Sequence, residues 1–476
     1  MDNTISSRDY GVLPGWRRYN PIPVRIDLLY SALAASPIRG ESGPISWEFS
    51  LHAPTQQGNS GISRRHLLAA SAGAALSTLL VACGGQPEPE AAPAVPEPPP
   101  ATKTDAPETA AEPARPASVA PAAPVAVAET PTQGLLAGLR PLEGYGFQAH
   151  LYNQDRALVT RLTREAGFNW LKQQIWWKFT EPVEKGGFDW AELDKVVGDV
   201  SAAGLNLLLS IVQAPGWALE GREHGPPANP ADFKDFMGAL ANRYFGRVQA
   251  YEIWNETNFA REWGVLDDGA YRAYGELLKA GYEGVKGVDP DATVVFGAPT
   301  PTGVADPNIA MDDAVYLEKV YEAMPEIGDY YDAMGAHPPG FNNAPDQPFG
   351  AERGDGWNGH NSFYFLRFTD YRRIMEANGD VDKPIWFTEF GWSTANQAEG
   401  YGYGVDNTEE DQAKFLLGAF GLIRRDHPYV THMFVWNLNF QMVVGPEDEK
   451  YPFGVVRSDG SPRPGYLVLK AMDKGL

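Results

Sequence analysis

The chain has 476 residues, of which 43% are hydrophobic, and its 13 Trp, 21 Tyr and 22 Phe are enough for one large core or two smaller ones. Its formal net charge of −22 argues against nucleic acid as a partner, because binding to a phosphate backbone needs clustered Lys and Arg. The single Cys excludes an intramolecular disulfide and a structural zinc site built on several cysteines.

Residues 63–83 have the features of an export signal. The pair Arg64-Arg65 precedes an apolar, Ala-rich run, 67–82, that is short for a membrane-spanning helix. The pair resembles a twin-arginine signal, and the run ends in LVAC, which resembles the lipobox of bacterial lipoproteins. We therefore expect an exported, extracytoplasmic protein that begins at Cys83 and is held at a membrane or cell surface by a lipid on that residue. The alternative is a chance apolar segment that ends in a buried cysteine.

Two segments beside the signal are expected to lack a folded core. Residues 84–134 are mainly Pro, Ala and Glu, with too few large apolar side chains to offset the entropy of ordering, so we predict a disordered tether. Residues 1–62 precede a signal that normally stands near the start of a chain. Either the region before the arginine pair is unusually long or translation starts after Met1, and we treat this extension as unstructured.

From Gly144 onward, apolar runs typical of strands alternate with longer amphipathic stretches, which is the pattern of βα units around a parallel sheet. The predicted strands are 144–150, 169–175, 205–212, 248–254, 293–298, 330–337, 384–390 and 431–437. The predicted helices are 157–166, 190–203, 230–244, 269–287, 312–324, 362–378 and 409–426. This order predicts an α/β fold, a single (β/α)8 TIM barrel over residues 135–476. A doubly wound open sheet is the main alternative, but no glycine fingerprint for a dinucleotide follows the first strand.

Polar residues stand at several strand ends, where a TIM barrel carries its active site. They are His150, Asn255 and Glu256, His337, Glu389 and Trp436. The two glutamates follow strands four and seven, three apart in the ring, so their carboxylates can face each other across the mouth. Such a pair suits cleavage of a glycosidic bond, in which one group protonates the leaving oxygen and the other attacks the anomeric carbon. We expect the anionic partner to raise the pKa of the proton donor.

The segments around these glutamates resemble the two signature strands of clan A glycoside hydrolases, retaining enzymes on a TIM barrel. The segments are YEIWNETN (251–258) and PIWFTEFGWST (384–394). GFDWAELDKVV, the stretch from NPADFKDF to YEIWNE, and the closing FGVVRSDGSPRPGYLVLKAM are similar to bacterial relatives of the family 39 β-xylosidases, over 144–472. The resemblance implies that Glu256 is the general acid/base, Glu389 the nucleophile, and Asn255 the donor to the sugar hydroxyl beside the anomeric carbon.

The chain departs from the family pattern at two points. Family members often carry Tyr shortly after the His that ends strand six, but here His337 is followed by PPGF, so Tyr331 or Tyr364 would have to replace it. Relatives often have Arg on strand two, where this chain has Lys172, so a point charge replaces a planar fork. These departures concern the sugar-binding details rather than the two glutamates.

Several tryptophans are candidate sugar platforms. By the same resemblance, Trp436 is expected to stack on a sugar ring. Trp217, Trp176 and Trp177 follow strands three and two, and each can act as a platform or as core packing, because large aromatic side chains serve in both.

The remaining site predictions use strand alternation and residue type. Alternation predicts that Trp254 shares a side with Glu256, and Phe387 with Glu389. Two histidines, His337 and His150, are predicted either to contact sugar or to be satisfied strand-end histidines. Lys172 and Trp217 complete the predicted substrate-binding set.

The predicted activity is that of a retaining glycoside hydrolase, which cleaves O-glycosidic bonds of an oligo- or polysaccharide through a glycosyl-enzyme intermediate. No cofactor is expected, and no catalytic metal, because no HExxH-type spacing occurs. The alternatives are a carbohydrate-binding lipoprotein without turnover and a transglycosylase that uses the same site. Two opposed carboxylates favour an enzyme, since binding alone does not require them. The expected partners are the carbohydrate and, through the lipid on Cys83, a membrane.

Overall fold

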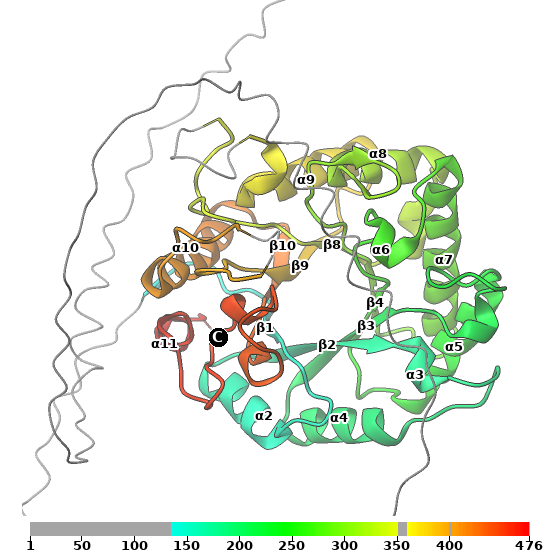
Figure 1. Ribbon diagram of the computed structural model, residues 1–476, viewed down its shortest axis with the longest axis horizontal. Helices are drawn as coiled ribbons and strands as arrows, with labels where there is room; N and C mark the ends of the chain where they lie inside the picture. Colours follow the sequence, from blue (N-terminus) through cyan, green and yellow to red (C-terminus); the bar gives the residue numbers. More distant parts are fainter. Residues whose placement is uncertain (1–134, 351–358, 399–401, 476) are drawn as a thin grey trace, which may run out of the picture. The chain divides into compact units, whose positions relative to one another are not determined.

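The computed structural model describes residues 135–350, 359–398 and 402–475, and there the chain forms a closed barrel of parallel strands surrounded by helices (Figure 1). The predicted extension, export signal, Cys83 and tether lie outside the described residues. Within the described part, the helices are too short or too polar to cross a membrane.

The barrel confirms the eight predicted strands, whose ends shift by three residues at most. The barrel strands are β1 (Gly144–Gln148), β2 (Trp170–Trp176), β3 (Asn206–Val212), β4 (Ala250–Ile253), β5 (Thr293–Phe296), β8 (Ala333–Ala336), β9 (Ile385–Phe390) and β10 (Val430–Val435). They follow one another around the ring in chain order, and β10 pairs with β1 to close it. A separate two-stranded sheet, β6 (Ala305–Asp306) and β7 (Ala310–Met311), lies in the segment after β5.

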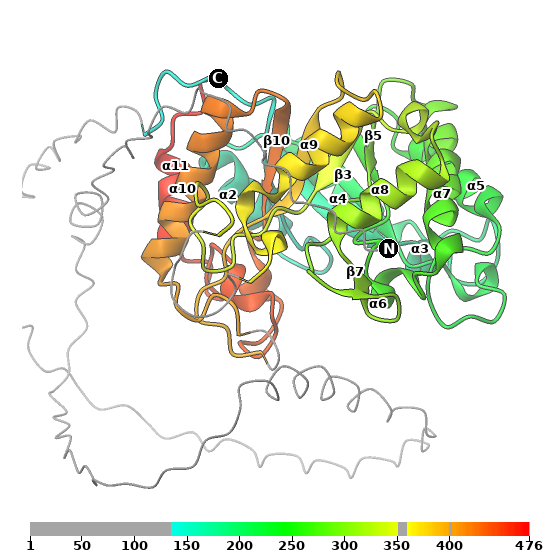
Figure 2. The same ribbon diagram turned by 90° about the horizontal axis from the view of Figure 1, so that it is seen from above.

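The long helices lie outside the ring (Figure 1). They are α2 (Arg156–Glu165), α4 (Ala191–Ala202), α5 (Pro230–Arg243), α7 (Asp268–Lys286), α8 (Asp313–Ala323), α9 (Phe368–Ala377), α10 (Glu409–Asp426) and α11 (Pro464–Ala471). The first seven correspond to the predicted helices, and α11, which was not predicted, lies beside α10 (Figures 1 and 2). Helix α5 illustrates the local cause: the Asn229 side chain caps its first turn, Pro230 occupies its first position, and its apolar face is buried.

The prediction of one helix over 362–378 was wrong in its first part. Two 3-10 turns, Asn361–Phe363 and Phe365–Arg367, precede α9. Arg367 donates hydrogen bonds to Asp312 and to Asp313, at 2.6 Å and 3.0 Å, and these buried contacts hold the turns against α8. Tertiary ion pairing therefore overrides local helical spacing here.

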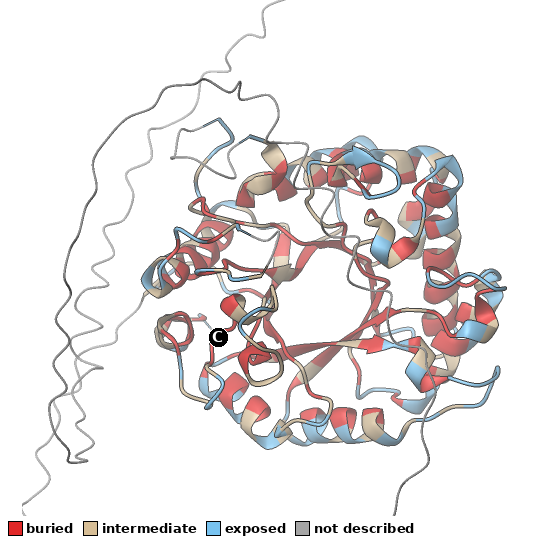
Figure 3. Ribbon diagram, in the orientation of Figure 1, coloured by how far each residue is buried: buried red, intermediate tan, exposed pale blue. Residues whose placement is uncertain are grey.

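The barrel strands consist almost entirely of buried residues (Figure 3). On the outer face they pack against the helices. Inside the barrel, seven side chains form a separate apolar cluster, called the lower layer: Trp170, Leu208, Ala250, Val295, Ala333, Trp386 and Phe434. Gly146 on β1 makes room for it, because a Cβ there would lie 2.3 Å from the Phe434 ring. The barrel is thus a filled core whose chemistry can develop only above this layer.

Candidate functional site

Glu256 stands in the loop after β4, where the chain leaves the extended conformation. Trp254 and Glu256 have φ angles of +69° and +48°, both in the left-handed region. The Glu256 N–H donates to the carbonyl of Ala298 at 2.9 Å, and the Asn258 side chain donates to the carbonyl of Thr300 at 2.7 Å. The loop that carries Glu256 is therefore fixed to the end of β5.

The same turn separates Trp254 from Glu256. The Trp254 ring is fully buried and packs against Phe233 of α5 and against Trp263, on the outer side of the barrel. Glu256 lines the cleft at the mouth. The prediction that these two side chains share a side was wrong, because alternation holds only while the backbone stays extended.

Glu389 is directed into the barrel mouth by a bulge in β9. Phe387 pairs with Met433 of β10 and Phe390 with Val435, so β9 has one extra residue between them. Phe387 consequently packs against α9, whereas Glu389 faces the cleft. The prediction that Phe387 and Glu389 share a side was wrong, because a bulge re-aims the side chains that follow it.

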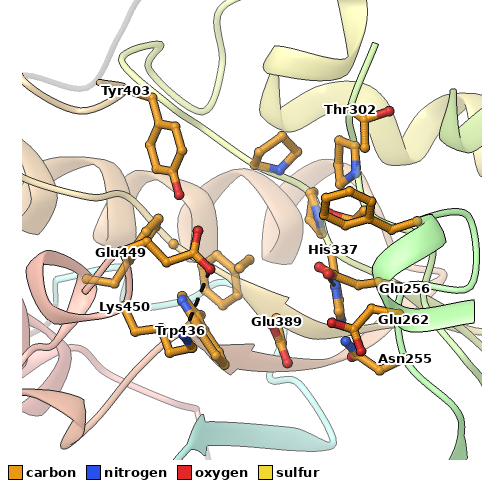
Figure 4. A pocket seen from close by; sticks show the side chains of 18 of the residues that line it. Asn255, Glu256, Glu262, Thr302, His337, Glu389, Tyr403, Trp436, Glu449 and Lys450 are labelled. Carbon is orange, nitrogen blue, oxygen red and sulfur yellow. Dashed lines mark hydrogen bonds and ion pairs between the residues drawn. The ribbon is translucent and has the colours of Figure 1, made fainter. Parts of the chain in front are cut away.

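The two carboxylates meet in a cleft of about 340 Å³ at the C-terminal ends of the strands (Figure 4). One oxygen of each carboxylate and one ring nitrogen of His337 all lie within 4.8 Å of one another. Five of the predicted site residues line this cleft: Asn255, Glu256, His337, Glu389 and Trp436. Figure 4 places Asn255, Glu256 and His337 on one side and Trp436 on the other, with Glu389 between them.

Three predicted substrate-binding residues lie elsewhere. Lys172 is fully buried beneath the cleft. His150 exchanges backbone hydrogen bonds with the side chain of Asn439 and does not line the cleft. Trp217 donates from its indole nitrogen to a backbone carbonyl and packs edge-on against Trp177, with ring centroids 5.7 Å apart. Packing therefore accounts for Trp217 and Trp177.

Neither tyrosine proposed for the position after strand six lies at the cleft. The Tyr331 hydroxyl, before β8, donates to Asp380 at 2.7 Å, and the Tyr364 ring is fully buried. Tyr403, from the segment after β9, lines the cleft instead and directs its hydroxyl into it (Figure 4). No sequence motif marks Tyr403, because the loop that carries it has no recognisable pattern.

Lys172 is the charged centre below the cleft. Its ammonium lies 3.0 Å from Glu389 and 2.8 Å from Glu252, and neither Lys172 nor Glu252 has exposed side-chain surface. Burial acts to lower the pKa of Lys172, but the two carboxylates raise it overall. Burial acts in the opposite sense on Glu252, yet Lys172 and His337 lower the pKa of that carboxyl. Lys172 and Glu252 are therefore both charged at neutral pH, and the Lys172 ammonium, 3.0 Å from Glu389, holds that side chain in place.

Glu256 is ionised in the unliganded protein. Burial acts to raise its pKa, but the hydrogen bond from His337 Nδ1, at 3.3 Å, and the charges of His337 and Arg261 lower it to about 2. The raised pKa that we expected for the proton donor is found on its neighbour: burial and the charges of Glu256 and Glu389 raise the pKa of Glu262 to about 7. Repulsion between like charges therefore raises a carboxyl pKa in this cleft, but the carboxyl group is that of Glu262 rather than Glu256.

The sequence did not indicate the charged rim of the cleft. Arg261 lies 3.9 Å from Glu256, 3.4 Å from Glu262 and 3.9 Å from Glu449, so it joins the loops after β4 and β10. Lys450 lies 3.9 Å from Glu449 (Figure 4). Arg261 and Glu262 lie in the short helix α6 (Ala260–Trp263), and Glu449 and Lys450 lie on a loop, so no sequence spacing relates the two segments.

Among the described residues, the group of His, Cys, Asp and Glu close enough to hold a metal ion is Glu256, His337 and Glu389. Two carboxylates and an imidazole suit several divalent ions. Lys172 and Arg261 already place positive charge beside the two carboxylates. The site therefore has charge compensation without an ion, and the prediction of a metal-free mechanism stays a prediction.

Comparison with known proteins finds similar folds among solved structures. No family model and no curated protein matches the sequence. Solved structures do: a family 39 glycoside hydrolase from the gut symbiont Bacteroides cellulosilyticus WH2 aligns over 68% of this chain and 62% of its own, with a TM-score of 0.52 and 24% identity. The likeness is one of fold.

A glucosidase from Croceicoccus marinus aligns over 70% of this chain and 67% of its own, with a TM-score of 0.52 and 15% identity. Of the family 39 protein described above, the aligned part of this chain spans 62%, which is less than two thirds. The similar structures include a member of the family to which the sequence motifs pointed.

Proposed function

We propose that the chain is an O-glycosidase, a retaining glycoside hydrolase that cleaves an oligo- or polysaccharide with Glu389 as nucleophile and Glu256 as acid/base. The observation that carries this proposal is the approach of the two carboxylates to within 4.8 Å in one cleft. Retaining enzymes hold their carboxyl groups about 5 Å apart, whereas inverting enzymes leave about 6.5–9.5 Å for a water molecule.

In the first step, Glu389 attacks the anomeric carbon while Glu256 gives a proton to the leaving oxygen, so a glycosyl-enzyme forms and the glycosidic bond breaks. In the second step, Glu256 removes a proton from water, the water oxygen attacks the anomeric carbon, and Glu389 is released. Asn255 Oδ1 and His337 Nε2 are buried without a hydrogen-bond partner, which suits contacts with sugar hydroxyls.

Glu256 must gain a proton before the first step, because its pKa of about 2 keeps it ionised in the unliganded protein. A sugar that displaces water from the cleft would strengthen desolvation, and one that engages His337 would weaken the contact that lowers this pKa. Glu262, with a pKa of about 7, lies in the same cleft and is about half protonated at neutral pH. Desolvation by the sugar and the weaker contact with His337 both favour protonation of Glu256 in the complex.

Chemical rescue tests the two roles. With an aryl glycoside whose leaving group is an acidic phenol, Glu256→Ala should still form the intermediate but hydrolyse it slowly, and azide should restore turnover with retained configuration. Glu389→Ala should lose activity on all substrates, and azide should give the inverted product. The opposite pattern would exchange the roles, and full activity in either variant would overturn the proposed mechanism.

We further infer that the protein is exported and lipid-anchored at Cys83, which the arginine pair and the lipobox-like LVAC support. Its partners would then be the carbohydrate and a membrane, while the net charge of −22 disfavours nucleic acid. Membrane fractionation and mass spectrometry of Cys83→Ala test this. If wild type and variant enter the membrane fraction equally and share one mature N-terminus, the anchor is ruled out.

A further inference from the structure

Two exposed aromatic side chains lie together at the rim of the barrel. Trp176, the last residue of β2, is 39% exposed, and Phe179, in the short helix α3 (Trp177–Thr180), is 61% exposed. Their ring centroids are 4.9 Å apart, with a 41° angle between the ring planes. The Lys178 ammonium lies 5.1 Å and 5.4 Å from the two ring centroids. We call Trp176 and Phe179 the rim pair.

Strand β2 directs Trp176 toward the mouth of the barrel. Alternate residues of this strand point inward: Trp170 belongs to the lower layer, Lys172 contacts Glu389, and Gln174 lines the cleft. The pairing of β2 with β3 runs without a register shift from Trp170 to Trp176, so the alternation extends to the last residue. Trp176 therefore follows Gln174 on the inner side of the rim.

Distance along the strand places the rim pair beyond the sugar that reacts. At about 3.3 Å per residue, Trp176 stands about 7 Å beyond Gln174 and about 13 Å beyond Lys172. The sugar attacked by Glu389 occupies the cleft next to Lys172. A sugar ring that contacts Trp176 must therefore belong to a different sugar unit of the same carbohydrate chain from the one that Glu389 attacks.

The rim pair does little for the fold. The aromatic core at this place is already formed by Trp177, which is fully buried and stacks on Phe236 with centroids 5.1 Å apart. Trp176 and Phe179, which are 39% and 61% exposed, gain less burial energy than a fully buried ring such as that of Trp177. The flat apolar face of an exposed aromatic ring suits the C–H face of a sugar ring. Lys178, whose ammonium lies over both aromatic rings, can donate to the hydroxyl groups at the edge of that sugar.

From this geometry we propose that Trp176 and Phe179 form a remote sugar-binding subsite, so that the natural substrate is a chain long enough to extend from Glu389 to the rim. This inference rests on the proposed function of the cleft. It adds that the enzyme prefers oligosaccharides and polysaccharides over disaccharides and aryl glycosides.

The test is the dependence of kcat/KM on chain length in the full chain. The probes are xylo- and gluco-oligosaccharides from the disaccharide to the hexasaccharide, together with the matching aryl glycosides. In Trp176→Ala, kcat/KM should fall about tenfold on the longest probes cleaved and stay unchanged on the shortest. Trp176→Phe should keep most of the preference, and Phe179→Ala should lose part of it.

Phe245→Ala is the matched control, because Phe245 is 58% exposed but lies between α5 and β4, at the opposite end of the barrel. It should behave as wild type. An equal effect of Trp176→Ala on all lengths, or none, overturns the subsite while the proposed function stands. If wild type cleaves none of these probes, calorimetric binding of the same probes decides: weaker binding to Trp176→Ala supports the subsite, whereas equal or no binding overturns it. The chemical-rescue experiment tests the proposed function separately.

Discussion

The lower layer of the barrel is apolar, whereas the layer directly above it, two residues further along the same strands, is polar. Trp170, Leu208, Ala250 and Trp386 fill the lower layer. Two residues further along their strands stand Lys172, Ser210, Glu252 and Thr388, which we call the upper layer, and all four are fully buried. Because side chains alternate, both sets point inward, but the second is polar and carries charges of both signs.

The two layers therefore have different roles although they are neighbours: the lower layer stabilises the fold, and the upper layer supports the cleft. The lower layer excludes water and contributes burial energy. In the upper layer, Lys172 lies between two carboxylates, Glu252 and Glu389, so the three groups carry one excess negative charge that the fold must tolerate. Substitutions in the two layers should therefore affect different properties of the protein.

The largest expected effect is on activity, in Glu389→Gln. The variant keeps the shape of the nucleophile but not its charge, so kcat should fall at least about 10⁴-fold. The free energy of unfolding should stay equal or rise, because Lys172 and Glu252 then form a neutral pair. Steady-state kinetics and urea unfolding measure both. Glu318→Gln, on an exposed face of α8, is the matched control, and a large loss of stability at Glu389 would contradict the separation of the layers.

In the lower layer, Phe434→Ala should show the reverse behaviour. Removing this buried ring should lower the free energy of unfolding by about 3–5 kcal/mol, because a cavity remains beneath the cleft. The kcat of the folded fraction should stay close to that of wild type. Phe245→Ala should change stability by less than about 0.5 kcal/mol. A kcat that falls as steeply as stability would show that the layers are not independent.

A double-mutant cycle sharpens the comparison within the upper layer. Lys172→Met leaves the buried Glu252 and the partly buried Glu389 without their cation and should cost about 3 kcal/mol or more in stability. Adding Glu252→Gln removes one of these charges and should restore part of the loss, while activity stays low in both variants. Thermal or urea unfolding of the four proteins gives the coupling energy. Additive changes, within about 0.5 kcal/mol, would contradict the shared ion pairing.

The smallest expected effect is the pH dependence caused by Glu262. Its pKa is raised from 4.5 to about 7 on folding, so the folded state holds a proton that the unfolded chain has released. Wild-type stability should therefore fall as the pH rises from about 4.5 to about 7, by up to about 3 kcal/mol relative to Glu262→Gln, and the difference should be constant above that range. Unfolding titrations at several pH values test this. A difference that does not vary with pH would show that Glu262 titrates normally.

Sequence predicted the barrel well, because each strand is a compact apolar run and each long helix has a continuous buried face. The two glutamates were also predictable, since each lies in a recognisable strand-end motif. Glu252 was also predictable, because it stands two residues after Ala250 in a buried strand, so its charge has to face the barrel interior and needs a cation such as Lys172.

Other features of the site depend on tertiary context. The left-handed residues Trp254 and Glu256 and the bulge before Phe390 change where side chains point, and neither has a marker in the residue types. Loops from different strands bring Arg261 and Glu449 together. Their charges determine which carboxyl group is protonated, so the pKa order of the cleft could not be predicted from the two glutamates alone.

The two ends of the described barrel meet on the side opposite the cleft. Leu135 forms a β-bridge with Met472, and its carbonyl accepts a hydrogen bond from the N–H of Asp473, near the start of β1 and β10. The described chain therefore enters and leaves the barrel at its base, away from the cleft. The same proximity makes the barrel suitable for circular permutation, with a short linker from Gly475 to Leu135 and new ends in an exposed loop.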